Sequence, residues 1–188
     1  TDILNNNDVS ASVGSDLQRS AFICSILAIL LMLVYITFRF EMTSGMAAVC
    51  CLMHDLLIML SVYVWLQIPL DSNFIAAALT ILGYSINDTV VVYDRIRENR
   101  GLLGKKASFE ELVNHSVNQS ARRTIITTVT TVMALGVMCI VSKLYGLDSI
   151  FTFAFPLMMG MLSGVYTSLC VSTSAWVAWS ERKNAKKN

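Results

Sequence analysis

Five stretches of the chain are long and apolar enough to cross a lipid bilayer, and this constrains the fold more than any other feature. A helix needs about 20 mainly apolar residues to span the hydrocarbon core. Backbone polar groups find no partners in lipid, so each spanning segment must satisfy its own hydrogen bonds as a helix. The stretches lie at residues 20–38, 43–68, 72–93, 124–142 and 153–178. The sequence therefore predicts an all-α membrane protein with five transmembrane helices.

The composition agrees with a membrane location. Hydrophobic residues make up 55% of the 188 positions and charged residues only 14%, whereas soluble domains are about 25% charged. The two histidines, His54 and His115, lie on different expected elements. No phosphate-binding loop, nucleophile constellation or metal-ligand spacing is visible. We therefore expect a protein that is not an enzyme and that needs no metal.

The charges outside these stretches predict an orientation. Residues 1–18 form a polar tail, residues 94–122 connect the third and fourth stretches, and residues 181–188 are basic. Most Lys and Arg residues fall in the 94–122 connection and the last segment, and cytoplasmic loops carry that excess. We expect an extracytoplasmic tail over 1–18, a transmembrane domain over 19–180, a cytoplasmic loop over 94–122 and a cytoplasmic C-terminus.

The expected cytoplasmic loop contains its own helix signal. Ser108 followed by Glu111 matches a capping box, in which each residue satisfies the backbone of the other. Apolar residues then recur at helical spacing, at Phe109, Leu112, Val113 and Val117. This pattern predicts a short amphipathic helix on the cytoplasmic membrane surface.

An acid interrupts the third apolar stretch. Asp88 lies within it, and Arg123 stands where the fourth stretch begins. A charge inside the bilayer costs a few kcal/mol, so such residues usually face water or a partner. We expect Asp88 and Arg123 to pair, with polar side chains beside them: Tyr84, Ser85, Thr127, Thr130 and Thr131. The pair either handles protons or only locks two helices while each Thr bonds its own backbone.

The second stretch contains His54 and Asp55 near its middle, the deepest ionisable residues of the chain. Asp55 would extend a proton relay, and His54 is able to titrate near neutral pH. The alternative is a packing hydrogen bond to a nearby Ser or Thr.

In the fifth stretch, Gly160 and Gly164 have the spacing that lets helices approach closely.

The segment from Leu79 to Asn99, "LTILGYSINDTVVVYDRIREN", closely resembles a signature of the SecF family of protein-export membrane proteins. Shorter segments occur in the same order as in that family: "VGSDLQRSAF", "RFE", "HDLLIML" and "SVNQSARRTIITTVTT". The resemblance covers about Val13 to Glu181. The residues of the long signature that we single out, besides Asp88, are Gly83, Tyr84, Asn87, Thr89, Asp94, Arg95 and Glu98.

The resemblance implies a bundle of the resistance-nodulation-division (RND) superfamily. The five spans would correspond to the second to sixth SecF helices, with the first helix and an extracytoplasmic domain lying before them. In such a protein, proton flow assists polypeptide translocation across the bacterial cytoplasmic (inner) membrane, and protons are the coupling ion without a further cofactor. Asp88 matches the family's intramembrane acid and Arg123 its basic partner, with Arg122 as a local alternative.

The same resemblance implies partners: SecD or a fused SecD half, the SecYEG translocon, a YidC-type insertase and the exported preprotein. Two other functions stay open at this point. One is a proton-coupled RND-type transporter of small molecules or lipids, for which a transported compound would alter proton flux. The other is a passive translocon scaffold, which would tolerate loss of Asp88 and Arg123 as long as the helices packed.

Overall fold

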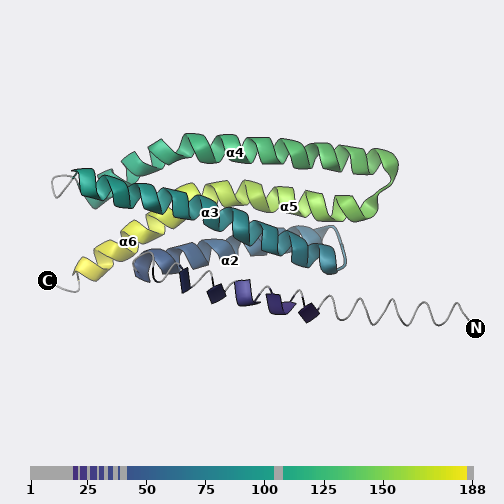
Figure 1. The fold of residues 1–188 in the computed structure, drawn as a ribbon, viewed down its shortest axis with the longest axis horizontal. Coiled ribbons are helices and arrows are strands. Elements are labelled where there is room, and N and C mark those ends of the chain that lie inside the picture. Colours follow the sequence, from purple (N-terminus) through teal and green to yellow (C-terminus); the bar gives the residue numbers. More distant parts are fainter. Residues whose placement is uncertain are drawn as a thin grey trace, which may run out of the picture.

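The computed structural model describes residues 42–103 and 108–185, together with scattered positions between 19 and 38. Within these residues the chain is helical and contains no strand (Figure 1). The elements are α2 (Met42–Trp65), α3 (Ser72–Leu103), α4 (Phe109–Tyr145), α5 (Asp148–Tyr166), the π-helical turn η2 (Thr167–Val171) and α6 (Ser172–Ala185).

Four helical segments are long and apolar enough to cross a membrane: Thr43–Trp65, Ser72–Leu102, Phe109–Tyr145 and Asp148–Ser180. The chain is thus a multi-pass membrane protein. The expected first span, 20–38, falls partly outside the described residues. Its described positions are helical, and large apolar side chains there, such as Phe22 and Leu31, are exposed. The count of five spans therefore stays a prediction, and the 1–18 tail lies outside the described part.

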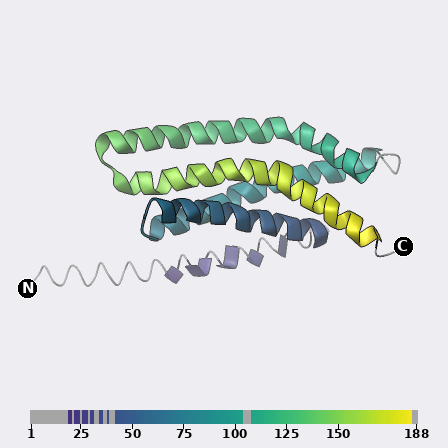
Figure 2. The same ribbon diagram turned by 180° about the vertical axis from the view of Figure 1, so that it is seen from behind.

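The long helices lie side by side along one axis (Figures 1 and 2). The last turn of α3 and the first turn of α4 lie at the same end as the last turns of α6, and we call this the α3–α4 end. The α4–α5 connection lies at the other end, called the α4–α5 end. Helix α5 is central, since it packs against α2, α3 and α4.

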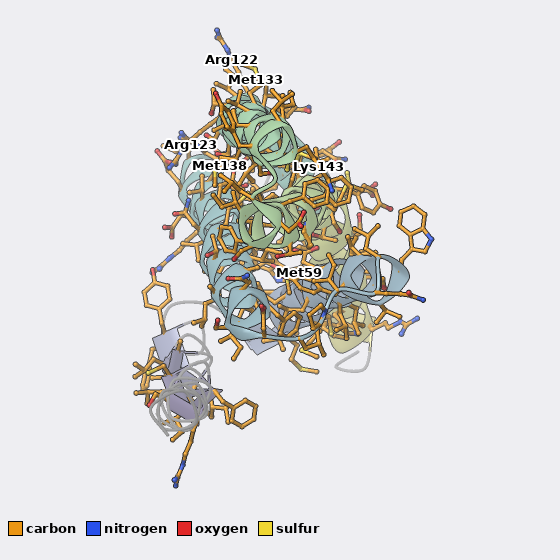
Figure 3. All side chains as sticks on the ribbon, turned by 90° about the vertical axis from the view of Figure 1, so that its right-hand side faces the viewer. Met59, Arg122, Arg123, Met133, Met138 and Lys143 are labelled. Atoms are coloured by element: carbon orange, nitrogen blue, oxygen red, sulfur yellow. The ribbon has the colours of Figure 1, made fainter. Side chains whose placement is uncertain are left out.

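Helix α4 is the least covered of the described spans. Only 22% of an 18-residue apolar stretch of α4 is buried, whereas 50% of the corresponding stretch is buried in the span that contains α5 and α6. Met133 lies on its uncovered face (Figure 3) and is exposed. Within the described residues, α4 therefore presents one long side to its surroundings.

Local sequence signals set the ends of the helices. Asp71 caps α3, because its Oδ1 accepts a 2.9 Å hydrogen bond from the Asn73 backbone N–H. The predicted capping box of α4 is confirmed: Ser108 Oγ accepts from the Glu111 N–H, and the Glu111 carboxylate accepts from the Ser108 N–H. Gly146 ends α4 in the left-handed conformation, with φ of 68°, which glycine adopts at little cost.

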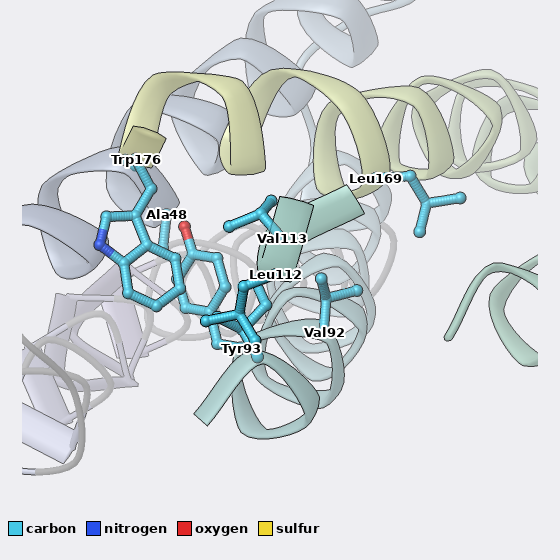
Figure 4. Close-up of a cluster of buried hydrophobic side chains, with 9 residues drawn as sticks. Ala48, Val92, Tyr93, Leu112, Val113, Leu169 and Trp176 are labelled. Carbon is cyan, nitrogen blue, oxygen red and sulfur yellow. The ribbon is translucent and has the colours of Figure 1, made fainter. Parts of the chain in front are cut away.

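The prediction of a separate amphipathic surface helix is wrong. The segment that begins at Phe109 continues without a break into the fourth span, and α3 extends beyond the expected 72–93 to Leu103. No Gly or Pro stands between Val117 and Thr124 to interrupt the helix. Its apolar face is also not free for lipid, because Leu112 and Val113 are buried in a core cluster with Trp176 (Figure 4).

The last span also differs from its expected range. Its helix begins at Asp148, ahead of the predicted 153–178, and runs through Pro156 inside α5. Gly160 and Gly164 do permit close approach, as expected. A Cβ at Gly160 would overlap Ile81 Cδ1 of α3, and one at Gly164 would lie 3.5 Å from Asp55 Oδ2 of α2. These glycines bring α5 against both helices.

Two apolar clusters flank a polar middle. One cluster lies at the α3–α4 end and includes Tyr93 and Trp176. The other lies toward the α4–α5 end and includes Tyr63 and Met161. Between them along each helix lie buried polar residues, which we call the polar layer: Asp55, Ser85, Asp88, Thr89, Thr124, Thr128, Thr167 and Ser168. The fold thus brings its two buried acids, Asp55 and Asp88, to the same level of the bundle, whereas other buried polar residues, such as Asn99 and Ser142, lie outside this layer.

Candidate functional site

Asp55 is the most enclosed acid of the described residues, with 0% of its surface exposed. Ser85 Oγ of α3 donates to its Oδ2 at 2.6 Å, and Ser163 Oγ of α5 donates to its Oδ1 at 3.2 Å. Thr167 Oγ1 lies 2.8 Å from Oδ1 and 3.0 Å from Oδ2. We call Ser85, Ser163 and Thr167 the hydroxyl cage. Hydroxyls both donate and accept, so this cage accommodates a charged or a protonated carboxyl group.

The helical repeat explains why Asp55 points inward and His54 outward. Cys51 and Met59, four residues to either side of Asp55, are also buried on the inner face of α2. His54 belongs to the next face, and 48% of its side chain is exposed. Its Nδ1 still lies 3.5 Å from Asp55 Oδ1. The predicted pair therefore occurs as one buried acid with a histidine at its outer side.

Asp88 lies on α3 one turn after Ser85 and is 6% exposed. Its Oδ2 accepts no hydrogen bond from the described residues, and the Thr124 hydroxyl of α4 is also buried without a partner among them. Tyr84 contacts Thr128 at 3.0 Å on one side of this level. A buried charged oxygen without a donor is costly. Asp88 is therefore suited to take up a proton or to accept a hydrogen bond from a guanidinium group.

The charge of Arg123 acts electrostatically on Asp88. Both arginines are exposed, and Arg122 extends away from the bundle while Arg123 lies nearer α3 (Figure 3). Within the described residues no ion pair of 4.0 Å or less joins Asp88 to either arginine. The structure thus places Arg123 near Asp88 but not in direct contact with it.

The predicted threonine face does not line the interior of the described bundle. Thr127 and Thr131 donate to backbone carbonyls of their own helix, at 2.8 and 2.9 Å, and Thr127 is exposed. Thr124 and Thr128 instead face inward toward α3. Sequence reasoning missed these two, although their i,i+4 spacing was visible. A relay role for Thr127 and Thr131 stays a prediction that would require a partner over that face.

The other signature residues divide between the two sides of α3. Thr89 is buried and its hydroxyl lies 3.1 Å from that of Ser168 in η2. Gly83 and Asn87 are exposed, and Asp94 is half-buried. Arg95 donates to Glu98 at 2.8 Å on the surface of the same helix. The signature therefore combines inward polar contacts with residues that face away from the described core.

Sequence reasoning also missed the partners of Asp55 on the last span. Ser163 and Thr167 are four residues apart and share one helix face. That spacing, next to Gly164, was the available signal. Among the described residues, no group of three or more His, Cys, Asp or Glu side chains is placed to hold a metal ion. The chemistry that the site offers rests on two buried carboxyl groups, with hydroxyls around Asp55.

These features define a multi-pass helical membrane protein that carries ionisable groups on two adjacent helices at mid-span. The sequence matches the family described as "Protein export membrane protein SecD/SecF, C-terminal" over residues 1–182. The chain belongs to this SecD/SecF family.

Individual relatives agree with the family assignment. The chain is 36% identical to the protein translocase subunit SecDF of Bacillus subtilis over 97% of its length, which is 24% of that protein. It is 37% identical to the protein translocase subunit SecF of Sebaldella termitidis over 92% of its length, which is 54% of that protein. The chain thus spans about a quarter of the fused relative and about half of the separate one.

Solved structures show the same fold. A crystal structure of SecDF in a super-membrane-facing form matches with a TM-score of 0.80 and 37% identity, over 93% of this chain and 23% of that one. The crystal structure of SecDF from Thermus thermophilus, a translocon-associated membrane protein, matches with a TM-score of 0.79 and 36% identity, over 87% and 22%.

Proposed function

We propose that the chain forms the SecF-type membrane part of a Sec protein-export machine, in which proton movement assists polypeptide translocation. Family membership and the names of the relatives, protein translocase subunits, support the export role. The observation that carries the proton role is the buried Asp88 carboxylate, whose Oδ2 has no donor among the described residues while the charge of Arg123 acts on it.

The two helices that carry these residues give a simple coupling scheme. When Arg123 approaches Asp88, the charged carboxylate is favoured. When α3 and α4 separate at this level, the isolated buried carboxyl group favours a proton, because an unpaired charge in a dry site is costly. Protonation and helix separation then promote each other, as linkage requires. Each proton that crosses would release about 2.3 kcal/mol per 100 mV of membrane potential, which is sufficient to bias two arrangements of the bundle.

The arginines support an orientation for this scheme. Arg95, Arg97, Arg100 and Arg122 lie at or toward the α3–α4 end. Cytoplasmic loops carry such an excess of positive charge. We therefore place the α3–α4 end in the cytoplasm and the α4–α5 end outside, in a bacterial inner membrane.

The uncovered side of α4 supports a partner. It carries Thr127, Thr130 and Arg123, all exposed in the described part of the chain. Polar groups at membrane depth usually face protein or water and not lipid. Since the fused relatives are about four times as long as this chain, a SecD-type half is the proposed cover. One solved relative is called translocon-associated, which supports a SecYEG-type translocon, with the YidC-type insertase and the preprotein as further proposed partners.

Export assays on the full complex test this proposal. Asp88→Asn keeps the size of the side chain and removes its ability to lose a proton. Export driven by the proton gradient should fall to the level seen without a gradient. Asp148→Asn, which alters an exposed acid at the start of α5, is the matched control and should leave export unchanged.

Each outcome favours one class of function. Export that continues at the normal rate in the Asp88→Asn protein, with normal assembly, would support a passive scaffold and refute the proton role. Proton flux that rises when a small amphiphile or lipid is supplied, without a preprotein, would support an RND-type transporter instead. Loss of gradient-driven export with unchanged assembly is the result expected here.

A further inference from the structure

The hydroxyl group of Thr167 has one hydrogen and four acceptor oxygens within reach. Asp55 Oδ1 and Oδ2 lie at 2.8 and 3.0 Å, and the backbone oxygens of Gly164 and Ser163 lie at 3.1 and 3.3 Å. A hydroxyl donates one hydrogen bond well at a time. The hydrogen of Thr167 must therefore choose between the acid on α2 and the backbone of its own helix.

The charge of Asp55 decides this choice. A carboxylate is a stronger acceptor than a peptide carbonyl, so a charged Asp55 holds the Thr167 hydrogen. If Asp55 takes up a proton from a hydronium ion, which leaves as water, the new carboxyl O–H can itself donate to Thr167 Oγ1. Thr167 is then free to donate to the Gly164 oxygen. One proton is added and none is lost, and only the Thr167 O–H bond turns.

The backbone is unusual at this position. Thr167 begins the π-helical turn η2, and its N–H already donates to the Gly164 and Ser163 oxygens. Its own oxygen accepts from the Ser172 N–H and lies 3.7 Å from the Cys51 thiol. π-helical turns occur frequently at functional sites, and a threonine that donates back to its own helix tends to bend it. A second donor at the Gly164 oxygen would therefore alter the turn that joins α5 to α6.

We infer that Thr167 is a positioning residue that couples the charge of Asp55 to the bend between α5 and α6. The inference rests on the proposed proton-handling function. It adds Asp55 as a second site at which protonation would change the conformation. Figure 2 shows α6 leaving the line of α5 at η2. Trp176 of α6 contacts Tyr93 of α3 and Phe109 of α4, with ring centroids 4.8 and 5.5 Å apart. A change of bend would thus reach the whole α3–α4 end.

Few other titratable groups are close to Asp55. Cys51 and His54 lie on its own helix. Helix α3 presents Ser85, with Asp88 one turn further along. The contacts given by α5 and η2 among the described residues come from the hydroxyls of Ser163 and Thr167. Among the described residues no Lys or Arg forms an ion pair with Asp55, and His54, whose Nδ1 lies 3.5 Å from Asp55 Oδ1, adds a positive charge only when it is protonated.

A distance measurement in the full-length protein, reconstituted in nanodiscs, tests the inference. Genetically encoded spin labels at Ile150 in α5 and Arg182 in α6, both exposed, report the bend by pulsed electron paramagnetic resonance. We expect the distance between the labels to change between acidic and alkaline pH. Asp55→Asn should abolish this change. Thr167→Val, which keeps the shape of the side chain and loses the hydroxyl, should abolish it as well.

Two further variants separate coupling from packing. Thr167→Ser keeps a hydroxyl and should retain the pH-dependent change. Thr173→Val removes a buried hydroxyl that donates only to carbonyls of its own helical segment, at 2.7 and 3.3 Å, and should also retain it. A change that survives in Asp55→Asn or Thr167→Val, that is absent from the unmodified protein, or that is lost in Thr173→Val would overturn the inference. None of these results affects the Asp88 export assay, so the two proposals fail separately.

Discussion

Ser85 and Asp88 stand one helical turn apart on α3 and serve two different acids. Ser85 donates a 2.6 Å hydrogen bond to Asp55 of α2, while the charge of Arg123 on α4 acts on Asp88. One turn of α3 thus carries both the hydrogen-bond donor of Asp55 and the second buried acid, Asp88. Any shift of this turn would change the surroundings of both acids together.

The hydroxyl cage predicts a ranking of stability losses. Ser85→Ala removes the shortest contact to Asp55, and hydrogen bonds to charged groups contribute about 1.5–3 kcal/mol. Ser163→Ala removes a 3.2 Å contact and should cost less, about 1 kcal/mol. Thermal unfolding in detergent measures both. Ser61→Ala, which removes an exposed backbone contact, is the control, and a loss there as large as that of Ser85→Ala would contradict the ranking.

A larger side chain at Gly160 should destabilise the protein, and a smaller side chain at Ile81 should reverse much of this effect. Gly160→Ala places a Cβ against Ile81 Cδ1 and 3.2 Å from Ile81 Cγ1, so the end of the Ile81 side chain must turn away, and overpacking of this kind should cost about 1 kcal/mol. The double variant with Ile81→Val lacks the clashing Cδ1 and should recover much of the loss. Gly136→Ala meets nothing within 4 Å and should stabilise α4 by about 0.5–1 kcal/mol. Equal effects at both glycines in unfolding measurements would refute this account of the α5–α3 approach.

Asn99 predicts where the α3–α4 hairpin opens. Its side-chain amide donates to Ser116 at 2.8 Å and to Gln119 at 2.9 Å, across the two helices. Asn99→Ala should speed amide hydrogen exchange on both sides of the connection, at a cost of about 1–2 kcal/mol. Asn118→Ala changes an exposed residue of α4 and should have little effect. Exchange that rises only in α3 would show that the two contacts do not hold the hairpin.

The neighbouring arginines provide a matched functional pair. Arg123→Gln should lower gradient-driven export about tenfold or more, which corresponds to about 1.4 kcal/mol, because it removes the charge that acts on Asp88. Arg122→Gln changes the same residue type one position away and should have a much smaller effect. The reverse order in the export assay would assign the partner role to Arg122.

The sequence was sufficient for the helical membrane class and for the presence of Asp55 and Asp88 inside spans. The length of an apolar stretch, and the position of a charged residue within it, can be read directly from the sequence without knowledge of the fold. The sequence was not sufficient to predict the lengths of α3 and α4. Both helices continue beyond the apolar stretches and pack in an apolar cluster at the α3–α4 end. Nor did it indicate that Thr124 and Thr128, not Thr127 and Thr131, face α3. A helix rotation of about 100° per residue decides that choice, and only the packing partner fixes the rotation.

The central claim is that Asp88 gains and loses a proton according to the position of Arg123. Infrared difference spectroscopy of the full-length protein across a pH step measures this most directly, through the carbonyl stretch of a protonated carboxyl group. We predict a band that disappears in Asp88→Asn, changes its pH dependence in Arg123→Gln and is unchanged in Arg122→Gln. A spectrum in which Asp88→Asn leaves every carboxyl band in place would contradict the claim.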